Sequence, residues 1–228
     1  MSEAARTDLP EQLQAGLGDR IRQARIAKGL SARAFARSLG LSPSLISQIE
    51  LGKALPSVGT LFAMVSKLGL SLDEIFFDST AGDDAAPSAP IARGPAEGTV
   101  PVDAGGAVQR SSDRRAITLA SGVRWERLTP DHDYETDFLA VTYDVGAASC
   151  PEDALMTHSG KEYGLVLEGR LGATIGFASY ELGPGDSIAF EAAIPHRLWT
   201  IGDQPSRVVW TIVGRHGDPR FAPGRVGG

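Results

Sequence analysis

The spacing of apolar residues changes once along this chain, and the change limits the folds open to it. Up to residue 78, apolar residues recur every three or four positions, which is typical of amphipathic helices. From about residue 114 they form short alternating runs separated by Gly, Pro and Asp, which is typical of strands. Residues 79–106, between the two parts, are rich in Ala, Gly, Pro and acidic residues and show neither spacing. We therefore expect a helical domain and an all-β domain.

The composition of the middle segment indicates where the domains end. A segment of this kind buries too little apolar surface to offset the entropy lost when it becomes ordered. We expect a helical domain over residues 1–78, a flexible linker over 79–113 and an all-β domain over 114–228. A length of 228 residues agrees with two domains of ordinary size.

Charge is divided unevenly between the two parts. Residues 1–78 carry nine Lys and Arg against eight Asp and Glu, whereas residues 79–228 carry thirteen against twenty. The net charge of −6 therefore comes from the second part. Because nucleic-acid binding depends on a local basic face, this overall acidity does not exclude DNA as a partner.

The sequence also indicates the compartment. No apolar run reaches the ~18 residues that a membrane helix needs. The first residues, "MSEAARTDLPEQLQ", lack the basic start and apolar core of a secretory signal. Cys150 is the one cysteine, which excludes an intrachain disulfide and a zinc site built from cysteines. We expect a cytoplasmic protein with no membrane partner.

Residues 1–78 contain the start and stop signals of five short helices. Ser31 and Ser42 are expected N-caps, and Gly29 and Gly40 are residues that end the preceding helices. Pro43 stands at a first helical position, where its missing N–H costs nothing. Residues at helical spacing that we expect in the core are Leu17, Ile21, Leu45, Ile46, Ile49, Leu61, Met64, Val65 and Leu68.

Two of these helices are separated by "LGL", and the second carries small polar residues on its outer side. This is the pattern of a helix-turn-helix. The stretch "LSARAFARSLGLSPSLISQIELGKALPSVGTL" resembles the Xre-type helix-turn-helix of bacterial repressors, over roughly residues 16–77. The resemblance implies a double-stranded DNA operator as partner, with residues 42–50 as the recognition helix.

The resemblance also assigns DNA contacts. Glutamine pairs with adenine and serine adapts to several bases, so the expected base-reading residues are Pro43, Ser44, Ser47 and Gln48. The expected phosphate contacts, from basic side chains and capped helix starts, are Ser31, Arg33, Arg37, Ser42 and Lys53. Leu51 stands where family members often carry arginine, which removes one phosphate contact. The resemblance further implies an internal ion pair between Arg25 and Glu50, which makes both residues structural.

The β region contains a candidate metal site. In a strand, residues two apart share a face, so Met156, His158 and Glu162 in "DALMTHSGKEYGLVLEGRLG" are expected to point the same way. His196 follows Pro195 in a second segment. Two histidines and one carboxylate form a set that suits a divalent metal ion.

These two segments resemble the cupin family, which implies a double-stranded β-helix barrel. The residues that match the two cupin motifs are His158, Glu162, Gly169, Gly185 and His196. The residues that depart from them are Met156, in place of the first histidine, and Glu191, Ala193 and Thr200 in the second motif.

The departure at Met156 leaves two interpretations open. His158, Glu162 and His196 hold one divalent ion, such as zinc, nickel, iron or manganese, with a thioether as a poor fourth ligand. Alternatively, the three residues form a hydrogen-bonded polar floor beneath an organic ligand. The residues expected at an effector pocket are Met156 and Tyr163 in its lining, and Arg124 and Arg197 as candidates to hold an anionic effector.

A helix-turn-helix joined to a cupin-like barrel resembles a class of bacterial transcriptional regulators in which the barrel binds a small metabolite. We expect such a regulator, and not an enzyme, acting as a homodimer on a palindromic operator. The alternative is a cupin-type metal-dependent dioxygenase or isomerase with a DNA-binding appendage. That alternative requires a firmly held metal with open coordination positions.

Overall fold

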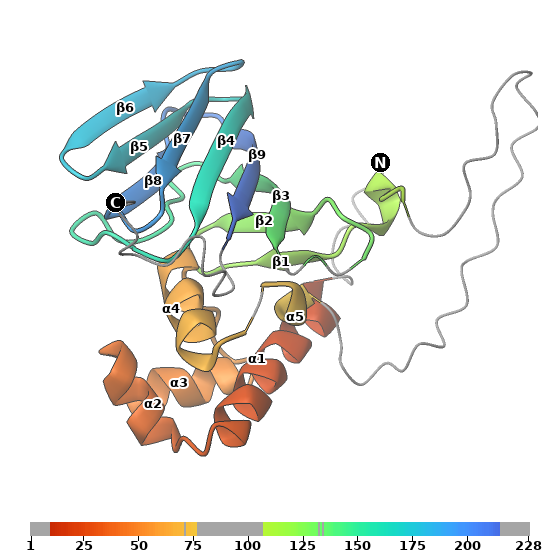
Figure 1. Ribbon diagram of the computed structural model, residues 1–228, viewed down its shortest axis with the longest axis vertical. Helices are drawn as coiled ribbons and strands as arrows, with labels where there is room; N and C mark the ends of the chain where they lie inside the picture. The colour runs from red at the N-terminus through yellow and green to blue at the C-terminus, as the bar shows by residue number, and fades with distance from the viewer. Residues whose placement is uncertain (1–9, 71, 77–106, 132, 134, 215–228) are drawn as a thin grey trace, which may run out of the picture.

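The first part of the chain is helical and the second part is built from strands, which confirms the predicted two-domain layout (Figure 1). The structure is a computed structural model, and it describes residues 10–70, 72–76, 107–131, 133 and 135–214. The predicted linker therefore lies outside the described residues as far as residue 106.

The helical domain begins and ends its helices at the expected residues. Ser31 and Ser42 accept hydrogen bonds from backbone N–H groups three residues later, at 3.1 and 3.2 Å, and Ser57 caps the fourth helix in the same way. Gly40 and Gly69 end helices in the left-handed conformation, with φ of 67° and 63°. The helices are α1 Pro10–Ala27, α2 Ala32–Leu39, α3 Pro43–Glu50, α4 Val58–Leu68 and α5 Leu72–Phe76. Among the described helices, none combines the length and apolar character needed to cross a membrane.

The predicted ion pair between Arg25 and Glu50 is present. The guanidinium of Arg25 donates from Nε and Nη2 to the two carboxylate oxygens of Glu50, at 2.5 and 2.8 Å. Arg25 also donates to the carbonyl of Leu30 at 2.6 Å. Both charged side chains are buried, so the pair fixes α1 against the end of α3.

The β domain consists of two antiparallel sheets. Their strands are β1 Ala116–Thr118, β2 Val123–Arg127, β3 Thr136–Tyr143, β4 Lys161–Glu168, β5 Leu171–Ile175, β6 Ala178–Leu182, β7 Ser187–Glu191, β8 His196–Thr200 and β9 Ser206–Val213. The larger sheet has the order β1-β2-β3-β9-β4-β7 and the smaller has the order β6-β5-β8. Contacts between residues of β4 and β8 show that the inner faces of the sheets share one interior. The all-β prediction is therefore confirmed.

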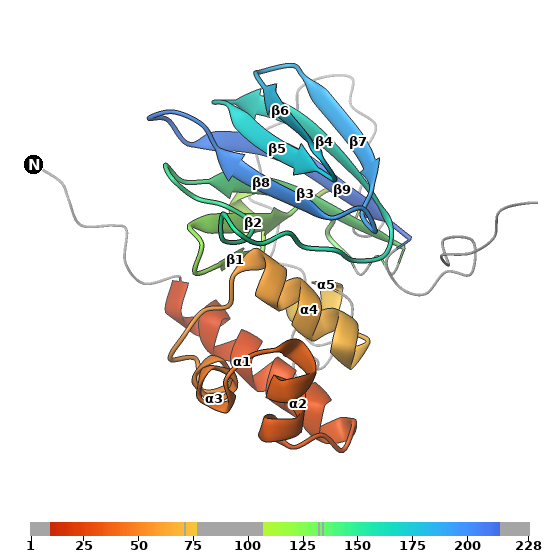
Figure 2. The same ribbon diagram turned by 90° about the vertical axis from the view of Figure 1, so that its left-hand side faces the viewer.

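Helix α4 lies beside the β domain in both views (Figures 1 and 2), and α5 also reaches it, because Arg115 donates to the carbonyl of Phe76 at 3.2 Å. The Gly59 N–H donates to the carbonyl of Ser149 at 3.0 Å, and the Ala120 N–H donates to the carbonyl of Pro56 at 3.1 Å. Buried apolar side chains of the two domains belong to one continuous cluster. The sequence predicted a tether between the domains but did not predict this contact.

Candidate metal centre and DNA-binding face

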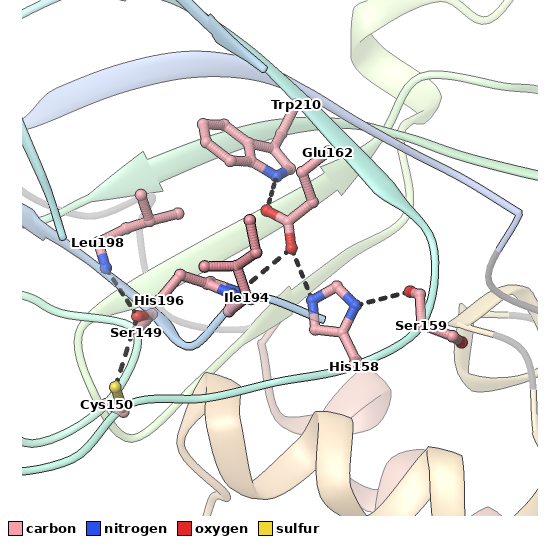
Figure 3. Close-up of polar contacts among 9 residues, drawn as sticks. All are labelled: Ser149, Cys150, His158, Ser159, Glu162, Ile194, His196, Leu198 and Trp210. Carbon is pink, nitrogen blue, oxygen red and sulfur yellow. Dashed lines mark hydrogen bonds and ion pairs between the residues drawn. The ribbon is translucent and has the colours of Figure 1, made fainter. Parts of the chain in front are cut away.

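Three buried polar side chains meet in the interior of the β domain (Figure 3). Glu162 lies on β4, where the strand alternation points it inward, and His196 begins β8. His158 lies just before β4. The segment around Met156 pairs with His196 through two backbone hydrogen bonds of 2.9 Å, which bring the two histidines together. The predicted cluster is therefore assembled from segments 38 residues apart along the chain, as counted from His158 to His196.

The atoms of the cluster converge on one point. His158 Nε2 lies 2.6 Å and His196 Nε2 lies 3.3 Å from Glu162 Oε1. One ligand atom from each residue lies within 4.8 Å of the others. Apart from these mutual contacts, the three atoms have no hydrogen-bond partner among the described residues. Buried polar atoms that have only one another as partners are rare in folded proteins, which makes this point a candidate ligand site.

The Nδ1 atoms of both imidazoles already have hydrogen-bond partners. Nδ1 of His158 lies 2.9 Å from the carbonyl of Ser159, and Nδ1 of His196 lies 2.8 Å from the carbonyl of Ile194. A carbonyl only accepts, so each Nδ1 carries a proton, and each ring turns its Nε2 toward Glu162 and the centre. This is the orientation that metal-binding histidines have, and the three residues therefore fit a divalent ion.

Trp210 on β9 orients the carboxylate. Its Nε1–H donates to Glu162 Oε2 at 2.7 Å, which leaves Oε1 for the histidines. The indole ring lies against Gly164, where an added Cβ would lie 2.1 Å from Trp210 Cζ3. Glycine at this inward position of β4 therefore makes room for the ring that holds Glu162 in place.

The cluster shifts the acidity of its own members. Burial raises the pKa of Glu162, but hydrogen bonds from His158 and His196 outweigh burial and hold that pKa at about 2. Burial lowers the pKa of His196, but its contacts with Glu162 outweigh burial and leave the pKa raised. Glu162 is therefore ionised, and it is paired with a proton that its contacts with His196 help to hold on that imidazole. A metal ion that enters the centre must displace that proton.

A small cavity lies over the cluster. Its volume is about 20 Å³, and Glu162, Met156, Trp125 and Tyr143 lie in its lining. Burial raises the pKa of Tyr143, so its phenol stays neutral. Most of the lining is apolar or aromatic, and Glu162 is the charged residue among the lining residues. A ligand that fits such a cavity has one polar head and an apolar body.

Two lining residues come from the helical domain. Val58 and Phe62 of α4 lie in the cavity wall. The ring of Phe62 stacks on the imidazole of His158, with centroids 4.3 Å apart and planes 14° apart, and contacts Trp125 at 5.3 Å. Phe62 is 4% exposed. The helical domain therefore closes one side of the site.

The structure places the four predicted pocket residues differently. Met156 lies in the cavity wall. Tyr163 is 42% exposed on the outer face of β4, and Arg124 is exposed on β2 beside Glu126. Arg197 lies over the ring of Trp199 and donates from Nε to the backbone carbonyl of Cys150, at 3.1 Å. The structure therefore does not bring these two arginines or Tyr163 to the cavity.

The predicted DNA-binding residues belong to α2, α3 and the residues that flank these helices. Ser42 caps α3, whose buried side contains Ile46 and Ile49. The predicted DNA-contacting residues are all exposed: Ser31, Arg33, Pro43, Arg37, Ser42, Ser44, Ser47, Gln48 and Lys53. Leu51, where the family often has arginine, is also exposed. Exposure of these side chains is a requirement for the predicted contacts with DNA.

Sequence analysis missed Val58, Phe62 and Trp210 as site residues. Gly164 was the available signal for Trp210, because glycine at an inward strand position indicates the close approach of another group. No pattern in the sequence signals Phe62, since the apolar spacing of a helix does not tell which neighbour it packs against.

The structure combines a helix-turn-helix domain with a β domain that contains a buried His–Glu–His cluster. This combination defines a DNA-binding protein with a second domain that contains a candidate ligand site. Residues 21–75 match the helix-turn-helix family, and residues 139–212 match the cupin domain family. The chain therefore belongs to the helix-turn-helix transcriptional regulators and carries a cupin domain.

Individual relatives agree with this assignment. The chain is 28% identical over 179 residues to the HTH-type transcriptional regulator PuuR of Escherichia coli K12, covering 78% of this chain and 84% of PuuR. It is 40% identical over 58 residues to YazB, an uncharacterized HTH-type transcriptional regulator of Bacillus subtilis, covering 25% of this chain and 84% of YazB. A crystal structure of an HTH_3 family transcriptional regulator from Vibrio cholerae has a TM-score of 0.60 at 20% identity, covering 89% of this chain and 97% of that one. This last likeness shows that the two domains share their fold with that protein.

Proposed function

We propose that this transcriptional regulator uses its cupin domain to sense a small molecule, and that His158, Glu162 and His196 hold one divalent metal ion at the sensing site. The observation that carries the proposal is the convergence of two imidazole Nε2 atoms and one carboxylate oxygen on a single buried point. Their Nδ1 contacts and the Trp210 contact support the ligand geometry. The metal would supply an electrophilic anchor for the polar head of the effector.

Met156 offers the sharpest test of the metal. Neutral imidazole binds zinc, nickel or iron far better than a thioether does, so Met156→His should increase the metal retained per chain after dialysis. A further His196→Ala in that variant should abolish the gain. If wild type and Met156→His both stay metal-free by elemental analysis and native mass spectrometry, the cluster is a polar floor for an organic ligand.

On the DNA side, we propose that α3 reads bases through Pro43, Ser44, Ser47 and Gln48. The support is their exposure on the helix face opposite the buried Ile46 and Ile49. Phosphate contacts from Arg33, Arg37 and Lys53, and from the helix starts capped by Ser31 and Ser42, would fix the register.

We further propose a homodimer, joined through the outer face of the larger sheet. A single helix-turn-helix buries too little surface for tight operator binding. On the outer face, Tyr163, Leu165 and Leu167 of β4 are 40–42% exposed, and Phe138 of β3 is 37% exposed. Strand β9 lies between β3 and β4, so these side chains gather on one side of the sheet. An apolar patch of this kind is typical of a protein interface.

The His–Glu–His set also favours a second candidate function, a metal-dependent oxygenase or isomerase with a DNA-binding domain. Such an enzyme needs room for substrate beside the metal, whereas the cavity here measures about 20 Å³. Oxygen uptake or turnover by the iron-loaded protein would support the enzyme. Metal binding without either reaction supports the regulator.

A further inference from the structure

Helix α4 belongs to two cores at once. Leu61, Met64 and Val65 are completely buried, as expected for the core of a helical domain. Val58 and Phe62, one turn apart, lie instead in the wall of the cupin cavity. A rigid helix thus connects the DNA-binding domain with the site over Glu162.

The size of the cavity limits what enters while α4 stays in place. A volume of about 20 Å³ holds roughly one water molecule or an ion, since a water needs ~10–15 Å³ on this measure. Ligand pockets for organic molecules measure about 300–1,000 Å³. A metal ion therefore fits beneath Phe62, whereas an organic molecule needs part of the wall to move.

The walls differ in how firmly they are held. Trp125, Val141, Leu198 and Trp210 stand on strands that are hydrogen-bonded to neighbouring strands along their length. The wall from α4 is attached to the β domain by apolar packing and by single hydrogen bonds, such as those from Gly59 to Ser149 and from Arg115 to the Phe76 carbonyl of the neighbouring α5, and by no strand pairing among the described residues. The stack of Phe62 on His158 is a contact between apolar ring faces with no covalent or strand connection. Displacing α4 therefore costs less than opening a sheet.

We propose that α4 is the gate of the cupin site and that Phe62 links the occupancy of this site to the position of the DNA-binding domain. A metal ion binds with the gate closed. A small organic molecule with one polar head for the cluster and an apolar body enters by displacing Phe62, and α4 moves with it. The signal is thus the organic ligand and not the metal. This inference rests on the proposed sensing function.

Linkage sets the size of the response. A ligand that binds only the open arrangement shifts the protein toward it by no more than its differential affinity. Its apparent affinity is also reduced by the small fraction of molecules that are open. Changes that hold the gate shut should therefore exclude the ligand, and changes that loosen the gate should admit it.

The chain offers a direct way to lock the gate. A Cβ added at Gly59 would lie 3.5 Å from the Cβ of Cys150, within the range of ~3.5–4.5 Å that disulfides span. Cys150 is the one cysteine in the sequence, so Gly59→Cys creates a single possible pair. Gly59→Ala is the matched control, because it adds the same Cβ without a thiol.

Diethyl pyrocarbonate is a suitable organic probe, because it acylates imidazole nitrogen and is larger than the closed cavity; the oxidised and reduced proteins are compared at one pH, so that the protonation of the imidazoles is the same in both. The metal-free full chain is treated, and modification of His158 and His196 is followed by mass spectrometry. Oxidised Gly59→Cys should react at least about tenfold more slowly at both histidines than the same variant after reduction and removal of the reductant. Gly59→Ala should react at the same rate before and after the oxidant. Equal rates in the oxidised and reduced variant would overturn the gate.

Substitution of Phe62 provides a second, independent test of the gate. Phe62→Ala, or Phe62→Leu if the smaller side chain destabilises the fold, should speed modification of both histidines. Phe35→Ala or Phe35→Leu removes the same groups from a fully buried ring on α2 and should leave the rate unchanged. Equal acceleration by the Phe35 variants would assign the effect to general loosening and overturn the role of Phe62. The probe needs neither the effector nor a metal. A negative result for the gate therefore does not decide the metal and DNA tests of the proposed function, and negative results in those tests do not decide the gate.

Discussion

Trp210→Phe should weaken the cupin site while leaving the domain folded. The substitution removes the Nε1–H that donates to Glu162 Oε2 at 2.7 Å, together with the outer indole atoms Cζ3 and Cη2 that lie over Gly164. Glu162 is 2% exposed, so water does not replace the lost donor. Hydrogen bonds to charged groups contribute about 1.5–3 kcal/mol, and we expect a loss of about 2 kcal/mol in the free energy of unfolding. Loss of a group that orients a metal ligand lowers metal affinity by about 10–100-fold.

Trp199→Phe is the matched control for this prediction. The ring of Trp199 also lies on a strand glycine, Gly172, with an added Cβ 2.1 Å from Trp199 Cε2, but it is not bonded to the cluster. Urea unfolding measures the free energy of unfolding, and competition with a chromogenic chelator measures the metal affinity. If Trp210→Phe and Trp199→Phe lose metal affinity equally, the indole N–H does not orient Glu162, and the reasoning from the carboxylate geometry is wrong.

Four further outcomes follow from the structure. Gln48→Ala should cost ~1–3 kcal/mol at the selected operator with little change on random DNA, and equal losses on both would remove its base-reading role. Arg37→Ala should weaken binding to both and flatten the salt dependence, and an unchanged slope would remove Arg37 from the phosphate contacts. Leu165→Glu, on the outer face of the larger sheet, should shift the protein toward monomer in sedimentation, whereas an unchanged dimer would place the interface elsewhere. In the metal-free protein, the lowered pKa of Glu162 stabilises the fold at pH values above ~4.3, the pKa of an unfolded glutamate, and this stability is lost as the pH falls toward 2. The raised pKa of His196 stabilises the fold at pH values below ~6.5, the pKa of an unfolded histidine, and this stability is lost as the pH rises. Thermal unfolding should therefore show the largest difference between wild type and Glu162→Gln between about pH 4.5 and 6.5, and a difference independent of pH would contradict the ion pairing.

Local signals predicted the helical domain well, because each helix is delimited by residues with a specific conformational role. Ser31 and Ser42 form the caps that their positions indicate, and Gly40 adopts the left-handed conformation that ends α2. The ion pair of Arg25 and Glu50 came from the family resemblance, since residues in two separate helices carry no mark of their contact.

The candidate metal cluster was also predictable, but its surroundings were not. Strand alternation placed Glu162 inward, and the same alternation turns the neighbouring Tyr163 outward, against the expectation that it lines the pocket. Arg124 is turned outward for the same reason, beside the inward Trp125 on β2. Phe62 was beyond prediction, because its contact with His158 depends on how two domains pack across a segment without regular pattern.

Occupancy of the cupin site should change the affinity of this regulator for DNA. The most direct measurement takes an operator fragment selected from random-sequence DNA and compares its dissociation constant for reduced Gly59→Cys before and after acylation of His158 and His196. We expect the dissociation constant to change by about tenfold or more, because the acyl groups hold Phe62 and α4 away from the cavity. The original dissociation constant should return after hydroxylamine removes those groups. The oxidised variant, treated in the same way, controls for acylation elsewhere and should keep its affinity. An unchanged dissociation constant in the reduced variant, with both histidines fully modified, would show that occupancy of the cupin site is not coupled to DNA binding.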